Sequence, residues 1–176
     1  MNSAELIQLI QKDIQRLISM LIPQLRSNIG TSHYRRLTEE QMFQRLQTAY
    51  SDLILWLQNQ DDAPLRAAGE SSGRQRFVEG IPLGQTVLAL VLAEKHFWRY
   101  LRSSAIAVDD ETQEKVNNFF QKRIYYTSRG YESALAESGL SAPPVQTETH
   151  ETSVTKPQAE GSMEISRGGQ VGEQGG

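Results

Sequence analysis

Apolar residues recur at intervals of three and four along most of the chain, the spacing that places them on one face of an α-helix. The first such stretch begins after Ser3, and its positions are Leu6, Ile10, Ile14, Leu17, Leu21 and Leu25. Pro23 lacks a backbone N–H and clashes with the turn before it, so we expect this helix to bend or break there. No segment has a period of two, so no strand is expected.

A second helix is predicted to begin at Thr38, whose hydroxyl can cap it while Gln41 reaches back to the cap. Its buried face should hold Leu46, Ala49, Tyr50, Leu53, Ile54 and Leu57. A shorter helix follows from Asp61 toward Phe77. Gly80 then allows a turn, and Pro82 suits the first position of a fourth helix.

The fourth helix is apolar around much of its circumference, so we expect it to be central; its apolar residues are Val87, Leu88, Leu90, Val91, Leu92, Phe97, Trp98 and Leu101. A fifth helix is predicted from near Asp109, where acidic residues favour a helix start, to Gly139. The predicted fold is therefore all-α. Residues 1–140 should form a single bundle of about five helices, with globin-like or bundle packing.

Composition changes after Leu140. Residues 141–176 are rich in Pro, Gly, Ser, Thr and Glu and contain no aromatic residue, so they cannot bury enough apolar surface to offset the entropy of ordering. We predict a disordered C-terminal tail. The tail holds 2 basic and 5 acidic residues, whereas residues 1–140 hold 16 of each, so the net charge of −3 comes from the tail.

A neutral folded part lacks the basic footprint that phosphate binding requires, so no nucleic-acid partner is expected. The chain has no cysteine, which excludes disulfides and thiolate chemistry and favours the cytoplasm. The longest apolar run, Val87 to Ala93, is far shorter than the roughly 20 residues of a membrane span. Acidic Glu5 and Asp13 lie where a signal peptide would be basic, so we expect a cytoplasmic chain without a membrane span.

Three segments carry a family resemblance. They are Gly73-x-x-Arg76-x-x-x-Gly80-Ile81-Pro82-Leu83, Lys95-His96-Phe97-Trp98-x-Tyr100-Leu101 and Phe119-Phe120-x-x-x-Ile124-Tyr125-Tyr126-Thr127-x-Arg129-Gly130-Tyr131-Glu132. Over roughly residues 4–136 the chain resembles the RsbRD-type N-terminal domain of RsbT co-antagonist proteins, a helical domain also found ahead of sensor histidine kinases.

The resemblance implies a regulatory input domain, usually fused to an output module, in a bacterial stress or two-component-type pathway. The chain after Leu140 has no room for such a module, so we expect the domain to act through a separate protein, such as a kinase or a sigma-factor regulatory protein. A homodimer formed through the long N- or C-terminal helices is also expected.

Arg74 and Arg76 are candidates for binding an anionic ligand or a partner, because an Arg fork suits carboxylates and phosphates. The alternative is that they pair with Glu70, Glu79 or neighbouring helices. Four further residues are expected to act structurally, as an elbow between the third and fourth helices: Gly73, Gly80, Pro82 and Leu83.

His96 lies among apolar residues, and three roles are open to it. It could be an axial ligand to haem, or line a small-molecule pocket, in a sensor; it could accept a phosphoryl group in a phosphotransfer module; or it could be an ordinary histidine bonded to a neighbour. No histidine pair has the spacing of metal ligands, so no metal is expected.

The aromatic residues Trp98, Tyr100, Tyr125 and Tyr126 could line a ligand pocket or a dimer face, or could belong to the core. Tyr125 and Tyr126 point about 100° apart on a helix, so one of them should face a groove or a partner. No catalytic motif is present, and we therefore predict a non-catalytic domain without a cofactor.

Overall fold

The computed structural model describes residues 1–139. They form an all-α bundle, as predicted, and contain no strand. The elements in chain order are α1 (Ser3–Ser27), the 3₁₀ helix η1 (Ile29–Arg36), α2 (Glu39–Asn59), α3 (Asp62–Val78), α4 (Leu83–Ser103) and α5 (Asp110–Glu137). The predicted disordered tail, residues 141–176, lies outside the described residues.

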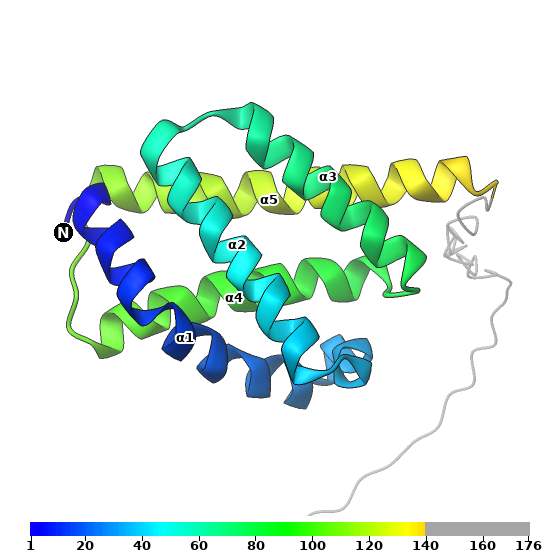
Figure 1. Ribbon diagram of the computed structural model, residues 1–176, viewed down its shortest axis with the longest axis horizontal. Helices are drawn as coiled ribbons and strands as arrows, with labels where there is room; N and C mark the ends of the chain where they lie inside the picture. The colour runs from blue at the N-terminus through cyan, green and yellow to red at the C-terminus, as the bar shows by residue number, and fades with distance from the viewer. Residues whose placement is uncertain (140–176) are drawn as a thin grey trace, which may run out of the picture. The chain divides into compact units, whose positions relative to one another are not determined.

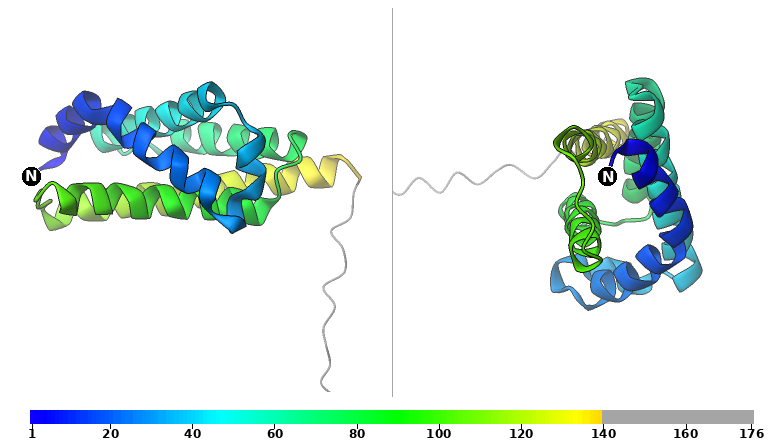
Figure 2. Two further views of the ribbon diagram at one scale, coloured as in Figure 1. Left: turned by 90° about the horizontal axis from the view of Figure 1, so that it is seen from below. Right: turned by 90° about the vertical axis from the view of Figure 1, so that its left-hand side faces the viewer.

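The helices of residues 1–139 pack in two layers. Helices α4 and α5 lie side by side, and α1, α2 and α3 cover them (Figures 1 and 2). The 3₁₀ helix η1 packs against both α1 and α4. The largest fully buried side chains come from α1, α2, α4 and α5; they include Leu6, Ile10, Leu17, Leu21, Leu53, Phe97 and Phe119.

Two helix starts follow the capping chemistry that the sequence indicates. The Thr38 hydroxyl accepts a hydrogen bond from the Gln41 backbone N–H at 3.1 Å, and the Gln41 side chain accepts one from the Thr38 N–H at 2.9 Å. The Asp109 carboxylate accepts a hydrogen bond from the Thr112 N–H at 2.8 Å, and this bond lowers the pKa of Asp109. Each cap satisfies a donor that the first helical turn leaves free.

Of the two outcomes expected at Pro23, the break does not occur, because α1 continues through the proline to Ser27. The segment Ile29–Arg36, for which the sequence shows no apolar period, forms 3₁₀ turns on either side of a kink at Thr31. The buried Thr31 hydroxyl holds this turn, because it donates to the Leu25 carbonyl at 2.6 Å.

The predicted elbow is shorter than expected. Gly80 has φ +68°, a left-handed conformation that glycine adopts without strain, and Pro82 precedes Leu83, the first residue of α4. The Pro82 carbonyl accepts hydrogen bonds from Gln85 and Thr86, each at 3.0 Å. Gly73, however, lies inside α3 and is not part of the elbow.

Gly73 instead belongs to a close contact between α3 and α5, which we call the glycine seam (Gly69, Gly73 and Gly130). A Cβ atom at Gly73 would lie 2.0 Å from the Thr127 carbonyl oxygen, and one at Gly130 would lie 2.0 Å from the Glu70 carbonyl oxygen. At Gly69 a Cβ would lie 2.6 Å from the Cβ of Tyr126. The two helices therefore meet backbone to backbone, which only glycine allows.

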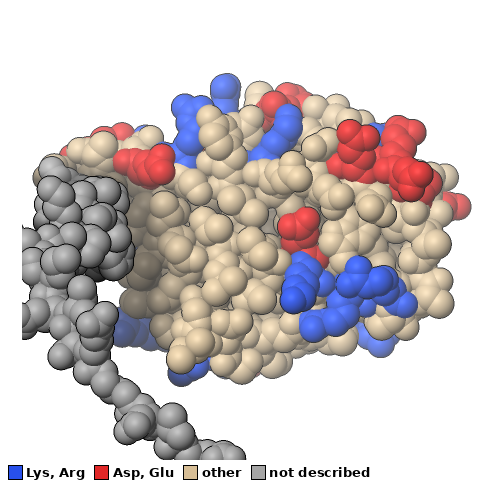
Figure 3. All heavy atoms as spheres, turned by 180° about the vertical axis from the view of Figure 1, so that it is seen from behind, with Lys and Arg blue, Asp and Glu red and all other residues tan. Residues whose placement is uncertain are grey.

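Among residues 1–139, none of the helices is both long enough and apolar enough to cross a bilayer. The face opposite to that of Figure 1 carries basic and acidic side chains that adjoin one another in several places, with broad uncharged surface around them (Figure 3).

Candidate ligand-binding cavity

A cavity of about 80 Å³ lies between the two helical layers. Helices α2, α3, α4 and α5 supply most of its wall, and Leu25 of α1 and Tyr34 of η1 complete it. The apolar wall consists of Leu25, Met42, Leu46, Ala49, Leu53, Ala89, Leu90, Ala93, Phe119 and Phe120. A wall of this kind suits the apolar body of a small molecule.

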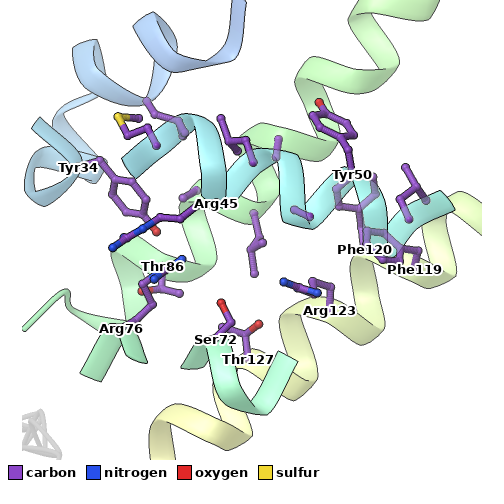
Figure 4. Close-up of a pocket in the computed structure, with 18 residues that line it drawn as sticks. Tyr34, Arg45, Tyr50, Ser72, Arg76, Thr86, Phe119, Phe120, Arg123 and Thr127 are labelled. Atoms are coloured by element: carbon purple, nitrogen blue, oxygen red, sulfur yellow. The ribbon is translucent and has the colours of Figure 1, made fainter. Parts of the chain in front are cut away.

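Three arginines also line the cavity, from three different helices. The guanidinium groups of Arg45 (α2) and Arg76 (α3) come together at one end beside the Tyr34 hydroxyl, and Arg123 (α5) reaches in from the opposite side (Figure 4). Arg123 and Arg76 are only 5% and 8% exposed. Charged groups buried this deeply require partners, since isolated burial of a charge is costly.

The partners present are two carboxylates. Glu79 accepts hydrogen bonds from Arg45 at 2.6 Å and from Arg76 at 3.3 Å. Asp52 pairs with Arg123. Three guanidinium groups thus share two carboxylates, which leaves one positive charge in excess at the cavity.

Several polar atoms of the wall have no hydrogen-bond partner in the protein. They are Nη1 of Arg45, Nε of Arg123 and Oγ1 of Thr127. Thr127 is 1% exposed and lies four residues after Arg123, so the two side chains occupy the same face of α5. Buried donors are almost always paired, so these atoms are open to a partner inside the cavity, such as water or a ligand.

The excess positive charge also affects proton binding at the Arg45–Arg76 end. Burial, and then the neighbouring charge of Arg76, lower the pKa of Arg45. Burial raises the pKa of the Tyr34 hydroxyl, and the charge of Arg76 partly opposes that rise. Burial thus disfavours charge on both groups, and the mutual repulsion of Arg45 and Arg76 adds to the effect at this end of the cavity.

Tyr50 contributes its ring to the wall, but its hydroxyl points away from the three arginines (Figure 4). That hydroxyl is buried without a partner, and burial raises its pKa. The ring lies 6.2 Å from the ring of Phe97, centroid to centroid. Tyr50 therefore belongs to the apolar wall rather than to the polar end of the cavity.

The two arginines that the sequence singled out have different positions. Arg76 lines the cavity, as an anion-binding residue would, and also forms the predicted ion pair with Glu79. Arg74 is exposed and pairs with Glu137 of α5 at 2.6 Å, which raises the pKa of Arg74 and lowers that of Glu137. Arg74 takes no part in the cavity.

His96 does not line this cavity. The residue is 1% exposed, and its Nδ1 atom lies 2.9 Å from Gln24 Nε2 and 3.2 Å from Arg99 Nη2. Burial lowers the pKa of His96, and the charge of Arg99 lowers it further. A phosphoryl donor could not reach a ring this deeply buried unless the helices separated.

The four aromatic candidates do not share a site. Tyr100 is buried and donates a hydrogen bond to Asp13 at 2.6 Å, whereas Trp98 is half-buried against the core. Tyr126 is half-buried, and Tyr125 is 56% exposed. The predicted inequality of the two adjacent tyrosines is therefore confirmed, and none of the four lines the cavity.

Sequence reasoning missed Arg45, Arg123 and Thr127. The first two belong to no motif in the sequence, and Arg123 lies 71 positions from its partner Asp52. One signal was available, because Arg123 and Thr127 fall four residues apart in a helix that otherwise turns apolar residues inward. A basic residue on a predicted core face indicates a buried polar site.

Within residues 1–139, no three carboxylate or imidazole groups lie close enough together to share a metal ion. Comparisons with family models, with curated proteins and with solved structures give no match to this chain.

Proposed function

We propose that this chain is a non-catalytic regulatory input domain whose helix packing responds to a small molecule in the cavity and which acts on a separate protein. One observation carries the proposal: a cavity between two helical layers whose wall combines apolar side chains with buried, unpaired donors. Unpaired donors weaken a protein without a ligand, so their presence favours a binding role over a purely structural one.

The position of the cavity supports a regulatory role. Its wall comes from both layers, so an occupant would contact α2 and α3 on one side and α4 and α5 on the other. A ligand that binds one arrangement of these helices better than another shifts the population toward it. A partner that contacts the outer surface of the helices could then detect the shift.

The family resemblance supports the choice of partner. The resemblance to RsbRD-type domains suggests that the output protein is a kinase or a sigma-factor regulatory protein in the cytoplasm. It also suggests that the working unit is a homodimer. Exposed apolar side chains are available for such contacts, including Ile29, Val78 and Tyr125. The absence of a catalytic motif is in keeping with a domain that works by binding.

Occupation of the cavity can be tested with xenon, an apolar probe that enters small apolar cavities. We expect xenon to shift the backbone amide signals of the wall residues in nitrogen-15 NMR spectra. Ala89→Leu fills the cavity and should abolish these shifts, whereas Ala67→Leu on the exposed face of α3 should not.

The regulatory part is tested by hydrogen exchange on the same samples. An input domain should show altered amide exchange beyond the wall residues when the cavity is occupied. Xenon binding without any such spread would mean that the cavity is a passive packing defect, and no binding at all would refute the site itself.

A further inference from the structure

The unpaired donors of the cavity define the chemistry of its ligand. We infer that the cavity binds a short aliphatic or aromatic carboxylate, with the carboxylate held by Arg123 and Thr127 and the apolar body lying against Leu53, Phe119 and Phe120. This inference deepens the proposed function and rests on the cavity being a ligand site.

The charge balance selects a singly charged anion. Arg45, Arg76 and Arg123 face the cavity, and only Glu79 and Asp52 oppose them. Asp52 already pairs with Arg123, so the excess charge lies with Arg45 and Arg76, which share Glu79. A single carboxylate bound by Arg123 and Thr127 would balance this excess from across the cavity, whereas a phosphate dianion would exceed it. A cationic ligand would add to the excess.

The positions of the unpaired hydrogen-bond donors indicate where the carboxylate of the ligand would bind. The Nε atom of Arg123 and the Oγ1 atom of Thr127 are both unpaired, and both side chains lie on the cavity side of α5 (Figure 4). An N–H and an O–H one helical turn apart can each donate to one oxygen of a carboxylate. Arg123 keeps its pair with Asp52 in this arrangement, because that pair uses Nη1.

The volume limits the ligand's size. A cavity of 80 Å³ accommodates about five to eight water-sized spheres, since each requires about 10–15 Å³. Pentanoate, with seven heavy atoms, is therefore a suitable probe. Its neutral isostere pentanamide, the cation pentylammonium and the bare anions chloride and phosphate serve as comparisons.

Thr127→Val provides a specific variant. Valine has nearly the shape of threonine, and the lost hydroxyl has no partner in the protein, so the fold should persist. In NMR titrations at low chloride we expect pentanoate to bind the natural chain at least tenfold more tightly than pentanamide, and Thr127→Val to weaken pentanoate binding about tenfold or more. Xenon binding should be unchanged in the variant.

Thr86→Val is the control at the opposite end of the cavity, where Thr86 lies beside Arg76. The Thr86 hydroxyl donates to the Pro82 carbonyl at 3.3 Å, so the stability of this variant is measured alongside its affinity. It should leave the affinity for pentanoate within about twofold of that of the natural chain. If Thr86→Val weakened pentanoate binding and Thr127→Val did not, the head group would sit at the Arg45–Arg76 end and the assignment to Arg123 and Thr127 would be wrong.

Other results overturn the inference more completely. Equal binding of pentanamide or pentylammonium would show that charge is not recognised, and chloride or phosphate binding as tightly as pentanoate would show that the apolar wall contributes nothing. Absence of pentanoate binding while xenon still binds would refute the carboxylate and leave the proposed function standing. Absence of binding by every probe, xenon included, would refute both.

Discussion

Helix α5 takes part in two contacts of opposite character. Along the glycine seam it meets α3 so closely that a Cβ atom at Gly73 or Gly130 would lie 2.0 Å from a carbonyl oxygen of the other helix. Toward α2 and α4 the contact is made by long side chains whose charged ends are incompletely paired, and a cavity remains. The difference shows how one helix can pack closely on one face and leave a cavity on another.

The seam should tolerate the least change. Gly73→Ala places a Cβ atom 2.0 Å from a backbone oxygen that cannot move away without shifting α5. We expect a loss of about 3 kcal/mol or more in the free energy of unfolding, measured by urea denaturation. Gly84→Ala, at a helical glycine with nothing within 4 Å of its Cβ position, should instead stabilise the protein by about 0.5 kcal/mol. Equal effects of the two substitutions would mean that the seam is looser than described.

The buried ion pair at the cavity wall should be the next most sensitive feature. Asp52→Ala leaves the 5% exposed Arg123 without its carboxylate, and we expect a loss of about 2 kcal/mol in the same measurement. A carboxylate ligand should restore part of this loss, since it supplies the missing charge.

The exposed Arg74–Glu137 pair is the control for that prediction. Glu137→Ala should leave the denaturation midpoint unchanged, because solvent screens the interaction. A large effect there, or none for Asp52→Ala, would contradict the distinction between wall and surface.

The smallest effect is expected at the unpaired hydroxyl of Tyr50. Tyr50→Phe removes a buried group that forms no hydrogen bond, and it should raise the stability by up to about 1 kcal/mol. Tyr100→Phe, which removes the donor to Asp13, should lower it by about 1 kcal/mol. Thermal unfolding of the two variants would therefore move in opposite directions, and a loss of stability in Tyr50→Phe would reveal a hidden partner.

Much of the fold could be predicted because the sequence signals of a helix lie within the helical segment itself. The three- and four-residue spacing located five helices, and the capping residues Thr38 and Asp109 located two of their starts. The 3₁₀ helix Ile29–Arg36 was not predicted, because its conformation depends on the hydrogen bond from Thr31 to the end of α1 and on packing against α4. A sequence of polar residues carries no sign of such contacts.

The site was less predictable because it depends on where helices meet. Gly73 was assigned to the elbow, since a glycine near a turn is usually explained by backbone freedom; its actual role is steric and requires α5 to be present. The spacing of Gly69 and Gly73, with Ser72 between them, could have indicated a close helix contact. Arg76 was identified, but the neighbours that give it an anion-binding role come from other helices.

Thr127 belongs to both contacts of α5. Its carbonyl oxygen lies against Gly73 in the seam, while its hydroxyl faces the cavity. A ligand that pulls on this residue therefore cannot displace α5 alone, because α3 is locked to it. Any displacement of α5 that keeps the seam intact must carry α3 with it.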